Sequence, residues 1–292
     1  MNTMSSNTPL RDFNSVSPSA RALLLLKGLT DIPFAREAAT LISAPSAYEP
    51  DLSAHDYTLW ARTIHFEVRY KSINSLLAGL PVTNILELSS GFSFRGLYMA
   101  QRLPVYYIDT DLPDLIDTKK TMNEDLQGAE ALTGRLEVLP LNALDEENFD
   151  RTVAHFPPGP LAVVNEGLLM YLNMEEKEQL CAIIRRHLQQ RGGYWITADV
   201  YIRTQTAYHD APAGDKLQEF FQQHHIQDNM FESFDAAEAF FKEQGFIIDQ
   251  EAPLEYAASA LLPQLMQSAT PQQLEAMAQG GRIHATWRLR LG

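Results

Sequence analysis

Short apolar runs with the length of buried strands recur along this chain, and polar or helix-periodic stretches separate them. The runs are NILEL (84–88), VYYI (105–108), RLEVLPL (135–141), PLAVVNE (160–166), GYWITADV (193–200), GFIIDQ (245–250) and HATWRLRL (284–291). Strands that alternate with helical stretches are typical of βαβ units, in which a helix connects two parallel strands. The pattern therefore predicts an α/β fold with a doubly wound, mostly parallel seven-stranded sheet.

The chain begins with a tail rich in Ser, Asn, Thr and Pro, and helical periodicity follows to about residue 80. We predict a mobile tail to about residue 18, short helices at 20–29 and 35–42, and a long helix from about 54 to 78. Another helix is expected after Asn173, which can cap it reciprocally with Glu176, and Gly192 is placed to end it. The expected organisation is a tail and helical cap over 1–80 and a core over 81–292, with a lid inserted at about 201–234.

Charge and cysteine content narrow the choice of partners. The 292 residues carry a formal net charge of −14, which repels phosphate and disfavours nucleic acid and anionic membranes. Cys181 is the only cysteine, so neither a disulfide framework nor a cysteine-based zinc cage can form. The longest early apolar run, 22–26, is too short to span a bilayer. We therefore expect a cytoplasmic protein that acts on a small molecule.

Two features early in the predicted core favour a ligand that contains ribose. Ser89, Ser90 and Gly91 form a small-residue turn after the strand at 84–88, and small residues let a ligand approach the backbone. An ordinary turn with no ligand has the same pattern. About twenty residues on, Asp109 and Asp111 end the next strand, where a carboxylate can accept both ribose hydroxyls or merely shape a turn. The two features strengthen each other because they occur at this separation.

Glu166 and Tyr171 follow the strand at 160–166, in the segment NEGLLMYL. Ligands of open α/β sheets bind at the carboxyl ends of the strands, so Glu166 can hold the amino group of an amino-acid moiety and Tyr171 can border the reacting atoms. The alternative is a capping carboxylate and a packed aromatic ring. Glu166 is the stronger candidate, because burying a carboxylate without a partner is costly.

These three segments, in this order, resemble the leucine carboxyl methyltransferase family and its bacterial relatives, the polyketide-type O-methyltransferases. The likeness runs from about Arg62 to Asp199. The family typically has an Arg-Thr-like pair on a helix, an L-G-A-G-x-D-T-R turn, an acidic turn before proline, an aspartate-leucine pair and an E-G-x-L-x-Y-L segment. This chain has matching positions for nearly all of them. The resemblance implies a Rossmann-like class I methyltransferase fold, S-adenosylmethionine (SAM) as cofactor and S-adenosylhomocysteine (SAH) as its product.

The resemblance also implies roles for individual residues. Arg62, in WARTI, would bind the carboxylate of SAM, which suits a planar bidentate donor. Arg21 would correspond to a basic residue of the family's N-terminal cap. The remaining implied roles are the methionine portion for Ser89 and Gly91, the ribose for Asp111 with Asp109, adenine for Asn142 and Ala143, and the cofactor's amino group for Glu166.

The chain departs from the family pattern in the turn after the first strand. Ser89 and Ser90 replace a glycine-alanine step, and Ser93 and Phe94 replace an aspartate-threonine step. Arg95 keeps the arginine of the motif but loses the aspartate that partners it. Either another carboxylate replaces that aspartate, or the substrate side of the site has changed.

The implied enzyme activity is methyl transfer to the oxygen of a carboxylate or a phenol. A carboxylate is ionised at neutral pH and needs no base, whereas a base helps a phenol, and the candidates are His65, His209, His224 and His225. The pair at 224–225 lacks further ligands nearby, so no metal site is expected. Two alternatives remain: a non-catalytic or regulatory SAM- or SAH-binding protein, and a nicotinamide-dependent oxidoreductase. The second should carry a glycine-rich phosphate turn, which is missing here.

Overall fold

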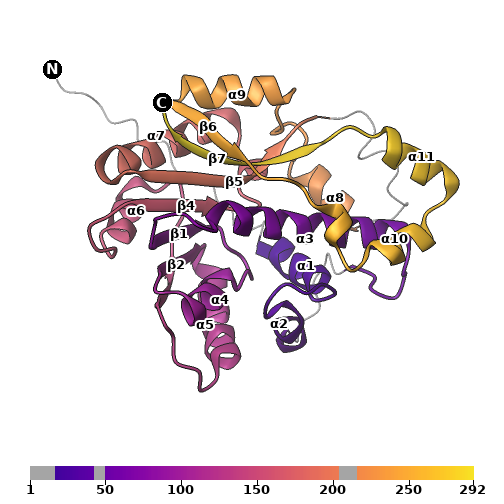
Figure 1. The fold of residues 1–292 in the computed structure, drawn as a ribbon, viewed down its shortest axis with the longest axis horizontal. Coiled ribbons are helices and arrows are strands. Elements are labelled where there is room, and N and C mark those ends of the chain that lie inside the picture. The colour runs from indigo at the N-terminus through magenta and orange to yellow at the C-terminus, as the bar shows by residue number, and fades with distance from the viewer. Residues whose placement is uncertain (1–16, 43–49, 204–215) are drawn as a thin grey trace.

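The computed structural model describes residues 17–42, 50–203 and 216–292. Seven strands form one sheet in the order β3-β2-β1-β4-β5-β7-β6, and β7 runs antiparallel to both of its neighbours (Figure 1). The predicted doubly wound, mostly parallel sheet is thereby confirmed. The strands are β1 (Asn84–Leu88), β2 (Tyr106–Asp111), β3 (Arg135–Pro140), β4 (Leu161–Asn165), β5 (Gly193–Tyr201), β6 (Phe246–Glu251) and β7 (His284–Leu291).

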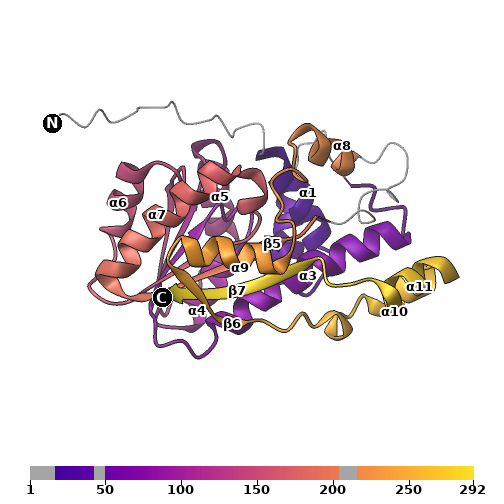
Figure 2. The same ribbon diagram turned by 90° about the horizontal axis from the view of Figure 1, so that it is seen from above.

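Both faces of the sheet are covered, which explains why the central strands carry apolar residues on both of their faces. In β1, Leu86 and Leu88 belong to one buried cluster, and Ile85 belongs to a second cluster on the opposite face. Side chains alternate along a strand, so an all-apolar strand needs a covering layer on each side. Figures 1 and 2 show these layers: α6 (Glu146–Val153), α7 (Met174–Arg191) and α9 (Phe234–Glu243) on one face, and α3 (Tyr57–Leu77), α4 (Arg95–Arg102) and α5 (Pro113–Gln127) on the other.

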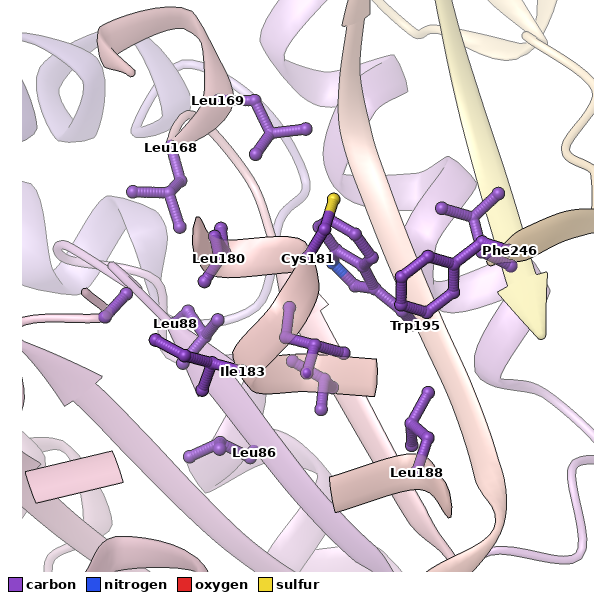
Figure 3. Packing of buried hydrophobic residues seen from close by; sticks show 14 of the residues in the cluster. Leu86, Leu88, Leu168, Leu169, Leu180, Cys181, Ile183, Leu188, Trp195 and Phe246 are labelled. Atoms are coloured by element: carbon purple, nitrogen blue, oxygen red, sulfur yellow. The ribbon is translucent and has the colours of Figure 1, made fainter. Parts of the chain in front are cut away.

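The helix α7 has the boundaries that its sequence predicts. Asn173 accepts a hydrogen bond from the backbone of Glu176, whose side chain accepts one from the backbone of Asn173, and Gly192 ends the helix at φ 71°. The buried face of α7 packs on the sheet around Trp195, and Cys181 lies in this apolar cluster (Figure 3). Burial raises the pKa of the Cys181 thiol and so keeps it protonated, which is consistent with a packing role for this residue.

The N-terminal helices lie beside the carboxyl ends of the central strands. α1 (Ser17–Lys27) contacts both α2 (Ala35–Leu41) and α3, and Gly28 allows α1 and α2 to approach closely. Most of the predicted tail lies outside the described residues. The long helix predicted at 54–78 is α3, which begins after Asp56, whose carboxylate caps Leu59. No described helix is long and apolar enough to cross a membrane.

Two insertions flank the C-terminal strands. The predicted lid at 201–234 includes 204–215, which lie outside the described residues, and its described part contains α8 (Lys216–Gln223). The second insertion joins β6 to β7 through η3 (Tyr256–Ala258), α10 (Leu262–Ser268) and α11 (Pro271–Gln279), and the sequence pattern did not single it out. Leu265 of α10 packs against Leu59 and Trp60 of α3. This insertion therefore extends the layer that α3 forms.

Candidate functional site

One cavity collects residues from the carboxyl ends of β1, β2, β3 and β4 and from helices α1 and α3. Because the strand order reverses direction between β1 and β4, the loops that follow these two strands diverge and leave a crevice. Seven of the nine residues predicted for the site line this cavity: Ser89, Gly91, Asp111, Asn142, Ala143, Glu166 and Tyr171. Arg62 and Asp109 are not among its lining residues.

The turn after β1 is held against the end of β2. Ser89 has φ 48° and Gly91 has φ 51°, so both lie in the left-handed region that a non-glycine residue such as Ser89 rarely adopts. The backbone N–H of Gly91 donates to Oδ2 of Asp111 at 2.6 Å, and the N–H of Leu112 donates to Oδ1 at 2.7 Å. Each carboxylate oxygen keeps a further lone pair. Burial raises the pKa of Asp111, and the two amide donors oppose that rise.

Asp109 lies beneath this turn and not in the cavity. Its side chain is fully buried, and Oδ1 lies 3.3 Å from Nζ of Lys119. Lys119 also donates to Oγ of Ser90 at 2.5 Å. Burial raises the pKa of Asp109 to about 7. Asp109 and Lys119 therefore support the turn from below, which is a different position from the ribose contact that the sequence suggested.

Glu166 lies at the centre of a cluster of three cations. Its Oε1 accepts from Nζ of Lys27 at 2.6 Å and lies 3.5 Å from Nη2 of Arg69, while Oε2 accepts from Nη2 of Arg95 at 2.8 Å. Burial favours the neutral carboxyl, but the three cations outweigh it and hold the pKa of Glu166 well below its usual value. Glu166 is therefore an ionised carboxylate with a cation beside each of its oxygens.

Arg95 pairs with a different carboxylate in place of the aspartate that the turn lacks. Its Nη1 forms an ion pair with Glu87, on β1, and Tyr107 donates to the other oxygen of Glu87 at 2.6 Å. The guanidinium lies 4.4 Å from the ring centroid of Tyr70. Of the two explanations open at the sequence level, replacement by another carboxylate is the one that the structure supports.

The cavity contains Arg69 where the motif match pointed to Arg62. Arg69 lies seven residues, about two helical turns, beyond Arg62 on α3, and its side chain is almost fully buried. Its Nη1 donates to the phenol of Tyr201 at 3.0 Å, but its buried Nε has no hydrogen-bond acceptor among the described residues. A buried arginine with an unsatisfied donor is a natural site for an anionic ligand.

Lys27 was also missed by sequence reasoning, which considered Arg21 as the basic residue of the cap. Lys27 lines the cavity, whereas Arg21 lines a separate groove between α1 and α5. Burial lowers the pKa of Lys27, and Glu166 opposes that effect. One signal was available: Leu23, Leu24 and Lys27 share a helical face by their spacing, which would have turned Lys27 toward the same side as the apolar stripe.

The loop that carries Glu166 is fixed by a second buried carboxylate, Asp199 on β5. Asp199 accepts from the backbone N–H groups of Gly167, Leu168 and Leu169 at 2.6, 2.7 and 3.1 Å. It also accepts from the side chain of Asn165 at 2.6 Å. These bonds hold the short helix η2 (Leu169–Tyr171) against the sheet. The resulting turn brings Met170, Tyr171 and Leu172 to the cavity wall.

The apolar side of the cavity contains Phe66, Met170, Tyr171 and Phe221. The hydroxyl of Tyr171 donates to Oγ of Ser19 at 3.3 Å, and burial raises the pKa of Tyr171 to about 12. Asn142 uses its own Oδ1 to accept from the backbone N–H of Leu144 at 3.1 Å. The histidines proposed as bases are elsewhere: those at 65, 224 and 225 do not line the cavity, and the one at 209 lies outside the described residues.

Solved structures share this fold at low sequence identity. A DUF574 family protein from Streptomyces avermitilis MA-4680 matches with a TM-score of 0.54 and 14% identity, over 94% of this chain and 97% of that chain. Magnesium protoporphyrin IX methyltransferase from Synechocystis PCC 6803, with bound SAH, matches with a TM-score of 0.49 and 8% identity, over 89% of this chain and 96% of that chain. Mitomycin 7-O-methyltransferase matches with a TM-score of 0.46 and 12% identity. The match covers 83% of this chain and 58% of the length of that protein.

No family model and no curated protein matches the sequence. The strand order, with β7 inserted antiparallel between β5 and β6, is the one expected for the Rossmann-like class I methyltransferase fold that the sequence resemblance implies. The comparison with the DUF574 family protein therefore shows a shared fold alone, and the chemistry of the site is argued from its residues.

Proposed function

We propose that this protein is a SAM-dependent O-methyltransferase of small molecules. The observation that carries the proposal is the convergence of Gly91, Asp111 and Glu166, from three neighbouring strands, on one cavity that also contains Arg69. A ligand that is part nucleoside and part amino acid matches this mixture of small residues, a carboxylate and paired charges. Arg69 lines the cavity and carries a guanidinium that can pair with a bound carboxylate, which supports this ligand.

In this proposal the residues divide the cofactor between them. Lys27 and Arg69 bind the carboxylate of SAM, and Glu166 orients these two cations and accepts from the cofactor's amino group. In this cluster three cations meet the carboxylates of Glu166 and Glu87, and Asp199 also acts on Arg69 by raising its pKa. The other assignments are Asp111 for the ribose, Asn142 and Ala143 for adenine, and Ser89 and Gly91 for the methionine portion.

The favoured acceptor is a carboxylate. Among the described titratable lining residues, Glu166 has a depressed pKa and is a weak base, and Lys27 is ion-paired with Glu166. Tyr171 is protonated at neutral pH, and Asp111 already accepts two amide bonds. An acceptor that is already ionised needs none of them. When bound, SAM would supply an electrophilic methyl group for transfer to the acceptor oxygen, with SAH as the leaving group. The protein's contribution is to align the reactants and exclude water.

The resemblance to leucine carboxyl methyltransferases and polyketide-type O-methyltransferases supports the same reaction. The acidic segments after β2 and β4 carry this likeness, and Lys27 with Arg69 takes the role first assigned to Arg62. The apolar wall formed by Phe66, Tyr171 and Phe221 suits the hydrocarbon body of an organic acid.

Calorimetry with SAM, SAH and NAD tests the cofactor directly. We expect SAM and SAH to bind and NAD not to bind, because the turn after β1 offers no glycine-rich phosphate site. A second experiment incubates the protein with methyl-labelled SAM and a panel of organic acids and phenols. Label transferred to an acid as a base-labile ester supports the proposal. Binding of SAH without transfer to any acceptor favours the non-catalytic alternative, and binding of NAD alone overturns the proposal.

A further inference from the structure

Three polar groups behind the cavity form a chain that ends at Arg69. Nη1 of Arg69 donates to the phenol oxygen of Tyr201 at 3.0 Å, and Nε2 of His65 lies 2.7 Å from the same oxygen. His65 and Arg69 are four residues apart on α3 and therefore share one face of that helix. Tyr201 is the last residue of β5, so the chain links the helical cap to the sheet.

The environment holds this chain in one protonation state. Burial lowers the pKa of His65 to about 3, so its imidazole is neutral at physiological pH. Burial opposes the charge of Arg69, but Tyr201, Glu166 and Asp199 outweigh it and keep its pKa above the usual value. The charged guanidinium of Arg69 donates a hydrogen bond to the phenol of Tyr201. The phenol in turn donates a hydrogen bond to Nε2 of His65, whose imidazole is neutral with Nε2 unprotonated. The phenol of Tyr201 then accepts from Arg69 and donates to His65.

Packing restricts the same groups. The ring of Tyr201 is 5.1 Å from that of His284 and 5.8 Å from that of His65, and only 6% of Tyr201 is exposed. The guanidinium carbon of Arg69 lies 5.4 Å from the ring centroid of Phe66. Fixing one end of Arg69 against Tyr201 determines where the rest of its planar donor set points.

We propose that Tyr201, held by His65, is the positioning residue that aims Arg69 at the carboxylate of the cofactor. The proposal rests on the proposed function, because Arg69 is the residue that binds that carboxylate there. Tyr201 does not line the cavity and touches no ligand in this arrangement; it acts through Arg69. Tyr201 is also the first residue of the predicted lid segment at 201–234. Its carbonyl accepts from the N–H of Phe231, near the end of that segment, at 2.9 Å. The base of that segment and the cofactor's amino-acid end therefore share one residue.

The test compares two ligands on one variant. Tyr201→Phe keeps the ring and its packing but removes the hydroxyl. We expect it to raise the Kd for SAH about tenfold. Binding of 5′-methylthioadenosine, which has the same nucleoside but no amino-acid portion, should be unchanged. Tyr194→Phe, at the other end of β5, is the matched control and should bind both ligands as the unmodified protein does.

His65 gives a second, independent arm. His65→Gln retains a side chain that can hydrogen bond to the phenol and should bind SAH nearly as well as the unmodified protein. His65→Leu should weaken binding of SAH but not of 5′-methylthioadenosine. Equal weakening of both ligands by Tyr201→Phe would mean a general loss of structure and would overturn the proposal, as would unchanged SAH binding. Failure of the unmodified protein to bind SAH would instead overturn the proposed function.

Discussion

Nζ of Lys27 lies 2.6 Å from Oε1 of Glu166, although 139 residues separate the two in the chain. Lys27 ends α1, and Glu166 follows β4, so this ion pair joins the helical cap to the carboxyl edge of the sheet. Both side chains are at most 10% exposed. The pair therefore connects the stability of the cap to the charge arrangement of the cavity.

Glu166→Gln is expected to destabilise the protein strongly. The substitution keeps the shape of the side chain but leaves Lys27, Arg69 and Arg95 without their shared counterion. Removing one partner of a buried pair costs about 3–5 kcal/mol, because the remaining charge stays desolvated. Urea denaturation measures the loss in the free energy of unfolding. Glu147→Gln, which breaks an exposed pair with Arg151, is the control and should have little effect. Similar stabilities for the two variants would contradict the central role of Glu166.

The two arginines of α3 should behave differently. Arg69→Met should weaken SAH binding by about 2 kcal/mol or more, because it removes a buried donor set from the cavity. Arg62→Met should bind SAH normally, because Arg62 is half-exposed and does not line the cavity. Calorimetry with SAH on both variants decides the matter. The reverse order of effects would restore the assignment that the sequence motif suggested.

Asp111→Asn should weaken all adenosine-containing ligands alike. The substitution leaves one acceptor oxygen where the backbone N–H groups of Gly91 and Leu112 now use two. We expect a loss of about 1–3 kcal/mol for SAH and an equal loss for 5′-methylthioadenosine, because the ribose is common to both. This pattern differs from the one expected for Tyr201→Phe. A loss confined to SAH would place Asp111 at the amino-acid end of the ligand instead.

The free energy of unfolding should fall in mild acid, in part because of His65. Its folded-state pKa, about 3, lies below the unfolded value near 6.5, so only the unfolded chain takes up a proton as the pH drops through this window. Each such group contributes a slope of about 1.4 kcal/mol per pH unit. His65→Gln should therefore show a shallower loss of stability than the unmodified protein between pH 6 and pH 4. Parallel curves for the two proteins would show that His65 is protonated in the folded state.

The apolar patterning of the chain was sufficient to predict the sheet. HATWRLRL coincides with β7, and NILEL coincides with β1, because short runs rich in apolar residues and bounded by turns are typical of buried strands. The capping signals at Asn173 and Gly192 likewise predicted both ends of α7, because capping is decided by residues that are neighbours in sequence. Features that depend only on residues close together in the chain can therefore be predicted from the sequence.

The site was predictable only where it lies at strand ends. Asp111 and Glu166 could be found because parallel strands bring their carboxyl ends to one edge. Asp109, two residues before Asp111 and on the same face of β2, is nevertheless turned to Lys119 beneath the turn. No local pattern distinguishes these two aspartates, since the contact with α5 decides which one reaches the cavity.

The sequence by itself determined the sheet, both ends of α7 and the strand-end carboxylates, since each depends on periodicity or on residues a few positions apart. Only the tertiary structure decided which cations meet Glu166. Lys27, Arg69 and Arg95 come from three helices that the chain reaches at widely separated points, and their convergence depends on how α1 and α3 pack against the sheet. Helix packing is set by whole faces and not by a motif, so Arg62 and Arg69 could be told apart only when α3 was seen in its place.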